Sequence, residues 1–78
     1  MENLENQIRE IMSLIFNIDV GEIPNDAAYG IFEPWDSLNH MNLITALEEE
    51  FSIRFADEDV TDMLNISLVE EILKSNIN

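Results

Sequence analysis

Several residue types are scarce in this chain, and each scarcity excludes a class of protein. The 78 residues contain no cysteine, which excludes disulfide bonds and thiolate metal sites. No apolar run approaches the roughly 20 residues of a transmembrane helix, and the N-terminal segment lacks the basic residues of a signal peptide. We therefore expect no membrane insertion, no signal peptide and a cytoplasmic location.

Basic residues are also scarce, because 3 Lys and Arg face 17 Asp and Glu and give a net charge of −14. Such a charge repels nucleic acids and anionic membranes and attracts basic patches on other proteins. We expect protein partners with basic patches and no nucleic acid. The alternative is that the acidic residues serve solubility alone.

Glycine and proline occur twice each, and all four lie between Gly21 and Pro34. The flanking segments are therefore free to form helices. A hydrophobic content of 46% is too high for a disordered chain, and the length suits one domain, residues 1–78, with a thin core. Because disulfides are excluded, we expect stability to come from helix-on-helix packing.

The first segment predicts a helix over residues 2–16. Its apolar residues follow the spacing of one helical face, and Glu2 and Glu5 fall in the first turn, where the helix dipole favours acidic residues. Leu14 and Phe16 lie off this face, and we expect them to pack under the following loop. Residues 17–35 form that long loop, with a possible helical turn at 26–29.

The C-terminal third predicts short elements. Residues 53–55 are expected to form a loop whose apolar side chains plug the bundle, and 57–64 a short helix that opens with acidic residues. Ser67 and Glu70 have capping-box spacing, so a last helix is expected to start near Leu68. Lys74 falls in its closing turn, where a cation is favoured, and 75–78 are expected to fray.

The central segment predicts an amphipathic helix over residues 37–52. Asp36 is a suitable N-cap, and Ser37 takes the first helical position, where a phosphate ester would be well tolerated. Leu38 lies off the buried arc and is expected to be exposed. At 100° per residue the predicted buried arc comprises Met41, Leu43, Ile44, Leu47 and Phe51.

The sequence Asp36-Ser37-Leu38, followed by an acidic helix that closes with residues 46–51, resembles the acyl carrier proteins. The resemblance covers the helix, the acidity, the chain length and the long preceding loop. It implies a small antiparallel all-α bundle of three main helices and one short helix, and a monomeric carrier rather than an enzyme. It also implies that Ser37 carries 4′-phosphopantetheine, whose thiol holds acyl groups as thioesters.

The resemblance implies roles for the neighbouring residues. Asp36 would help a phosphopantetheinyl transferase to position its metal ion, although the protein itself is expected to hold no metal. The transferase and the acyl-loading and acyl-transfer enzymes would contact Leu38, Asn39, Met41, Asn42, Thr45, Glu48 and Glu49. Candidates for an acyl pocket are His40, Leu43, Ile44, Leu47, Phe51 and Ile72.

Some positions depart from the family pattern. Trp35 stands where a small or aliphatic residue is usual, Asn39 and Asn42 replace acidic residues, and the usual glycine just before the serine is missing. These differences favour a specialised carrier over a fatty-acid-synthesis member. A D-alanyl carrier, a peptidyl carrier and an acidic protein-binding module without a prosthetic group remain alternatives.

His40 lies three residues after Ser37 and, by angle, inside the apolar arc. We expect a half-buried histidine near the mouth of the core, with contact to the acyl chain or the arm as an alternative. A hydrolase that used Ser37 and His40 is a further hypothesis. We reject it because Asp36, Ser37 and His40 on one helical turn cannot form a working triad with an oxyanion hole.

Overall fold

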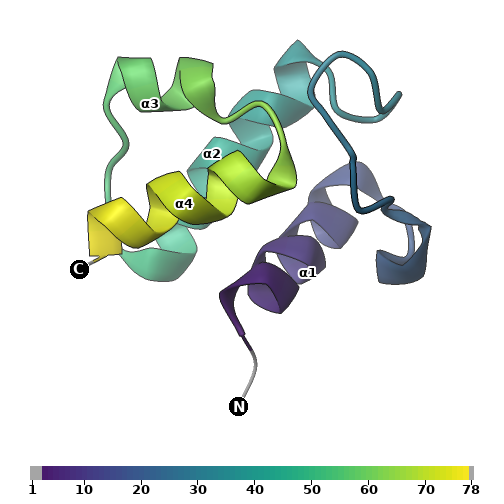
Figure 1. Cartoon of the computed structure of the whole chain (residues 1–78), viewed down its shortest axis with the longest axis horizontal. Helices are drawn as coiled ribbons and strands as arrows, with labels where there is room; N and C mark the ends of the chain where they lie inside the picture. Colours follow the sequence, from purple (N-terminus) through teal and green to yellow (C-terminus); the bar gives the residue numbers. More distant parts are fainter. Residues whose placement is uncertain (1–2, 78) are drawn as a thin grey trace.

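The computed structural model describes residues 3–77, and within this range the chain is all-helical (Figure 1). An isolated antiparallel bridge joins Ala28 to Asn65. The same range contains no helix with the length and apolar character needed to cross a membrane. This arrangement confirms the predicted fold class. The elements are α1 (Leu4–Phe16), η1 (Val20–Glu22), α2 (Ser37–Phe51), α3 (Asp57–Asp62) and α4 (Ile66–Ile77).

Helix α1 begins at Leu4 because the Asn3 side chain caps it, accepting the Asn6 N–H at 2.8 Å. The predicted start at residue 2 and the predicted place of Glu2 lie outside the described residues. Phe16 is buried, as expected, and its ring lies 6.0 Å from that of Phe32 in the loop. The prediction for Leu14 was wrong: it is 81% exposed.

The long loop between α1 and α2 contains a short 3-10 helix, η1, instead of a helical turn at 26–29. Glu22 stabilises η1, because its side chain accepts from the Asp19 backbone N–H at 3.4 Å and its own N–H donates to the Asp19 carbonyl at 2.9 Å. Residues 26–29 instead form turns, one closed by the Ala27 N–H on the Pro24 carbonyl. The helical turn of the loop therefore forms at Val20–Glu22, and not at the predicted residues 26–29.

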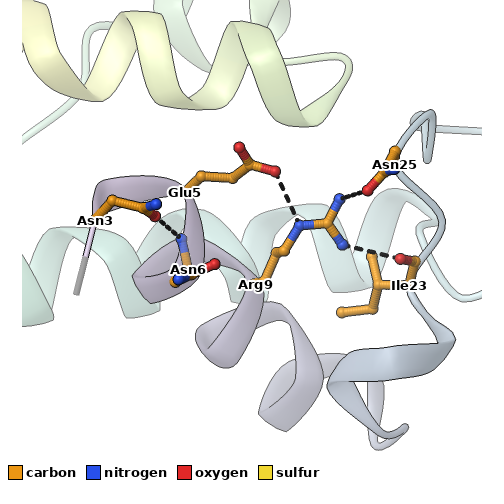
Figure 2. A network of polar contacts seen from close by, with 6 residues as sticks. All are labelled: Asn3, Glu5, Asn6, Arg9, Ile23 and Asn25. Carbon is orange, nitrogen blue, oxygen red and sulfur yellow. Dashed lines mark hydrogen bonds and ion pairs between the residues drawn. The ribbon is translucent and has the colours of Figure 1, made fainter.

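Arg9 ties this loop to α1 (Figure 2). Its guanidinium donates to the Ile23 carbonyl at 2.9 Å, to Asn25 Oδ1 at 2.7 Å and to Glu5 Oε2 at 3.1 Å. The Arg9 side chain is only 11% exposed, so these partners offset the cost of burying its charge. One of the three basic residues thus serves the fold.

The core lies between α1, α2 and α4, and α1 contacts both of the other two. Trp35, from the end of the loop, is fully buried in it, and its ring lies 5.9 Å from that of Phe16. A tryptophan in the core explains how so short a chain fills its interior. The other large, fully buried side chains are Ile8, Met12, Leu43, Leu47, Met63, Leu73 and Val69.

The C-terminal third largely follows the prediction. Phe55 is buried in the loop after α2, α3 opens with acidic residues, and Lys74 lies in the last turn of α4. Helix α4, however, starts at Ile66, because Asn65 Oδ1 accepts the Leu68 N–H at 2.8 Å and takes the capping role predicted for Ser67. Of the residues expected to fray, 75–77 are helical, and residue 78 lies outside the described residues.

Candidate functional site

Ser37 is the first residue of α2, and its side chain is exposed. Asp36 is the N-cap, as predicted: its Oδ1 accepts the Asn39 backbone N–H at 2.9 Å. The Asn39 side chain in turn donates to the Pro34 carbonyl at 2.8 Å. The sequence around the serine therefore fixes the helix start and leaves the hydroxyl at the surface.

A second hydroxyl lies beside Ser37, and no sequence pattern predicted it. The phenol oxygen of Tyr29, from the loop, is 2.7 Å from Ser37 Oγ. The Tyr29 backbone N–H donates to the Leu64 carbonyl at 2.9 Å, which joins the loop to the segment after α3 at this residue. Eight residues separate the two side chains in the sequence, so no local pattern predicts their contact.

His40 is buried, with 7% of its surface exposed, and both ring nitrogens have partners. The Trp35 indole N–H donates to His40 Nδ1 at 2.9 Å, and His40 Nε2 lies 2.8 Å from the Val60 carbonyl oxygen. Because an indole nitrogen only donates and a carbonyl only accepts, this geometry requires the neutral tautomer with the proton on Nε2. The imidazole also stacks on the Tyr29 ring, with centroids 5.0 Å apart.

These contacts link α2 to α3 through His40 and to the loop through Trp35 and Tyr29. The imidazole is more deeply buried than the half-buried histidine expected. It also cannot serve Ser37 as a general base while Trp35 and Val60 hold its nitrogens. The geometry therefore adds a second reason to reject the hydrolase hypothesis.

A groove of about 390 Å³ opens beside the site and is lined by Tyr29, His40, Val60, Thr61 and Leu64. Of the predicted acyl-pocket residues, only His40 borders it. Leu43, Ile44 and Leu47 are buried in the packed core, Phe51 is half-buried, and Ile72 borders a different cavity of about 410 Å³ between α3 and α4. Their role toward an acyl chain stays a prediction.

Comparison with known proteins supplies the family. No family model matches the chain. The acyl carrier protein of Buchnera aphidicola subsp. Schizaphis graminum is 46% identical over 59 residues, which cover 76% of this chain and 75% of the relative. The chain belongs to the acyl carrier protein family. Its relatives are named as carriers, and this protein is a carrier and not an enzyme.

A second relative comes from a different biosynthetic setting. Polyketide-8 synthase acyl carrier protein 2 of Streptomyces avermitilis is 27% identical over 73 residues, which cover 94% of this chain and 84% of the relative. The acyl carrier protein family, as these relatives represent it, therefore includes specialised members as well as proteins named simply as acyl carriers.

In this acyl carrier protein the predicted partner residues divide into two groups. Five of them are exposed and fall within about 60° of Leu38 on the helical wheel, so they form one stripe along α2 from the Ser37 end. We call this the α2 stripe. Met41 belongs to it and is 51% exposed, so its predicted place on the buried arc was wrong. The α2 stripe comprises Leu38, Met41, Asn42, Thr45 and Glu49.

The other two predicted partner residues are already engaged within the carrier. Asn39 bonds Pro34, as described above, and Glu48 Oε2 accepts the Phe55 backbone N–H at 2.9 Å. Glu48 therefore holds the loop after α2 in place. Within residues 3–77, no group of three or more His, Asp or Glu side chains could hold a metal ion.

Proposed function

We propose that this acyl carrier protein holds acyl groups as thioesters on a 4′-phosphopantetheine arm attached to Ser37. The observation that supports this most strongly is the exposed Ser37 hydroxyl at the first residue of α2, directly after the capping Asp36, in a chain of this family. The arm supplies a thiol that carries the acyl group. Tethering raises the effective concentration of that group at each enzyme that docks.

The residues around Ser37 suit such an attachment. The hydroxyl is exposed, and a phosphate on it would lie where the backbone N–H groups of the first turn have no partner within the helix. Asp36 uses one carboxylate oxygen for capping, and a carboxylate has further acceptor capacity. We propose that this capacity helps position the metal ion of the transferase.

We further propose that the α2 stripe is the docking surface for the transferase and for acyl-loading and acyl-transfer enzymes. Leu38 is 71% exposed next to Ser37, and Glu49 is the acidic residue of the stripe. An exposed apolar residue and an acidic residue on one stripe suit a partner with an apolar pocket and a basic patch. The net charge of −14 favours the same partners. The monomeric state and the cytoplasmic location stay predictions.

The nature of the cargo is a finer proposal. The match to a polyketide synthase carrier over 94% of the chain supports a specialised biosynthetic role. The groove beside Tyr29 and His40 is lined by one phenol, one imidazole, one hydroxyl and two aliphatic side chains. Such a lining accommodates a short polar acyl group as readily as an alkyl chain, so D-alanyl and peptidyl cargo remain alternatives.

The experiment is intact-mass measurement after incubation with coenzyme A and a promiscuous phosphopantetheinyl transferase. We expect the mass to rise by one phosphopantetheine moiety, and Ser37→Ala to abolish the gain. Ser67→Ala is the matched control, because Ser67 is also exposed and in the first turn of a helix, α4, but follows Ile66 instead of an aspartate. It should load like wild type.

A protein that gains no mass with an active transferase would contradict the proposal and favour the acidic binding module. The proposed role of Asp36 has its own test, Asp36→Asn. Asparagine caps helices as well as aspartate does, so α2 should persist by circular dichroism. We expect the loading rate to fall about tenfold or more, since a charge-assisted interaction is lost.

A further inference from the structure

The contact between Tyr29 and Ser37 is built into the fold. The Tyr29 ring is half-buried and stacks on His40, with the planes 29° apart. Its backbone N–H bonds the Leu64 carbonyl, and the preceding residue, Ala28, pairs with Asn65. The ring is thus held on two sides, and the direction of its hydroxyl follows from the backbone and the stack.

Stacking and burial would be served equally by phenylalanine. The hydroxyl adds a hydrogen bond of 2.7 Å, and that bond goes to the oxygen of Ser37. The stack also depends on His40, whose two nitrogens are fixed by Trp35 and Val60. The core of the protein therefore determines where the Ser37 oxygen is held.

We infer that Tyr29 is a positioning residue for the modified serine: its phenol orients the Ser37 hydroxyl before attachment of the arm and donates a hydrogen bond to the arm's phosphate afterwards. This inference rests on the proposed function. It assigns to the loop a direct contact with the phosphate, separate from the α2 stripe that meets partner enzymes.

The chemistry of attachment fixes the direction of the hydrogen bond, in which either hydroxyl can be the donor before the arm is attached. Ser37 Oγ forms a bond to the phosphorus of the pantetheine phosphate of coenzyme A, the pyrophosphate P–O bond breaks, and adenosine 3′,5′-bisphosphate leaves. The serine proton passes to a base on the transferase. Oγ then carries no hydrogen and cannot donate, so the phenol of Tyr29 must be the donor to the phosphodiester.

Attachment of the arm also gives the Tyr29 phenol a charged acceptor, the phosphodiester, in place of the neutral Ser37 hydroxyl. In the loaded protein the phosphorus would be bonded to Ser37 Oγ, which Tyr29 already contacts. The charged oxygens of the phosphodiester would be bonded to that phosphorus. Hydrogen bonds to charged acceptors are about twice as strong as neutral ones. The contact should therefore persist in the loaded protein and restrict the first part of the arm.

Tyr29→Phe removes only the hydroxyl and keeps the ring that stacks on His40. Loss of one neutral hydrogen bond in the unmodified protein should lower kcat for loading by about 2- to 10-fold. KM should stay unchanged, because Tyr29 lies outside the α2 stripe. Thr61→Val is the matched control: its hydroxyl lies by the same groove but donates to the Asp57 carbonyl, so kcat should not change.

The second readout is the ³¹P resonance of the loaded protein, which does not depend on turnover. In wild type and Thr61→Val we expect a broad line displaced from that of a free phosphodiester. In Tyr29→Phe the line should narrow and move toward the free value. Identical ³¹P spectra, or an unchanged kcat, for wild type and Tyr29→Phe would overturn the inference.

A third measurement leaves the sequence intact, in case Tyr29→Phe does not fold. Tyr29 is the one tyrosine of the chain, so incorporation of 3-fluorotyrosine gives a single ¹⁹F resonance. It should shift when the arm is attached, and no shift would count against the phosphate contact. Failure of wild type to load would instead contradict the proposed function, so the two failures are distinguishable.

Discussion

Two hydrogen-bond networks hold the long loop, and they do so in different ways. At its beginning, Arg9 of α1 uses a buried charge to hold Ile23 and Asn25 (Figure 2). At its end, Trp35 and His40 use neutral groups to join the loop to α2 and α3. The first network has no partner in the Ser37 site, whereas the second supports Tyr29, which contacts Ser37.

We therefore expect the Arg9 network to contribute to stability alone, and the His40 network to contribute both to stability and to the presentation of Ser37. Loss of either network should destabilise the fold, because each leaves buried polar groups without partners. Loss of the His40 network alone should also disturb Ser37. Two variants that lose similar stability, one in each network, should therefore differ in their loading rates. Equal losses of loading would contradict the distinction between the two networks.

The largest effect is expected at the centre of the His40 network, in Trp35→Ala. Removing a fully buried indole leaves a cavity and an unpaired His40 Nδ1, with a cost on the order of 5 kcal/mol. This could exceed the whole stability of a domain of this size. Urea titration followed by far-UV circular dichroism measures it, since Trp35 is the only tryptophan. A loss below about 1 kcal/mol would contradict the packing described.

His40→Phe should follow. The ring can still stack on Tyr29, but the Trp35 N–H and the Val60 carbonyl lose their partner, at a cost of about 3 kcal/mol. We expect loading to slow even at temperatures where the variant is fully folded. The tautomer in wild type can be checked directly: ¹⁵N shifts of the imidazole should show a protonated Nε2, and a protonated Nδ1 would refute the assignment.

Arg9→Met is the matched variant in the other network. It keeps an unbranched apolar side chain at the buried position but removes the guanidinium and leaves the Ile23 carbonyl unpaired, at a cost of about 2 kcal/mol. When the protein is fully folded, the loading rate should equal that of wild type. Slowed loading comparable to that of His40→Phe would show that the whole loop, and not its end alone, presents the serine.

The smallest effect separates two neighbouring glutamates of α2. Glu48→Ala removes the acceptor for the Phe55 N–H and should cost about 1 kcal/mol. Glu49→Ala removes an exposed charge from the α2 stripe and should change stability by less than about 0.5 kcal/mol. KM for the transferase should rise more in Glu49→Ala, and the reverse order would assign docking to Glu48.

Local patterns predicted much of this molecule. The cap at Asp36, the exposure of Leu38 and the burial of Leu43 and Leu47 follow from helix periodicity and capping chemistry. The errors arose where two residues could each cap the same helix, or where the exposure of a side chain depends on how the helices pack. Asn65 caps α4 ahead of Ser67. Met41 was assigned to the buried arc, but it lies at the edge of that arc toward Leu38 and is 51% exposed.

The contacts that define the site lie beyond such patterns. Tyr29 meets Ser37 because a backbone bond to Leu64 and a stack on His40 place its ring. The two partners of His40, Trp35 and Val60, come from different segments. The sequence alone showed that Trp35 and His40 were unusual. Only the fold shows that they are hydrogen-bonding partners, because the buried indole N–H of Trp35 needs an acceptor and His40 Nδ1 supplies it.

Locating the modification within the loaded protein tests directly whether Ser37 is the attachment site. Trypsin cleavage at Arg9 and Arg54 yields residues 10–54, which contain Ser13, Ser37 and Ser52, so fragmentation of this peptide must distinguish the three. We expect the phosphopantetheine on Ser37 alone. A gain on Ser13 or Ser52, or an unmodified peptide after treatment with active transferase, would contradict the assignment of Ser37 as the attachment site.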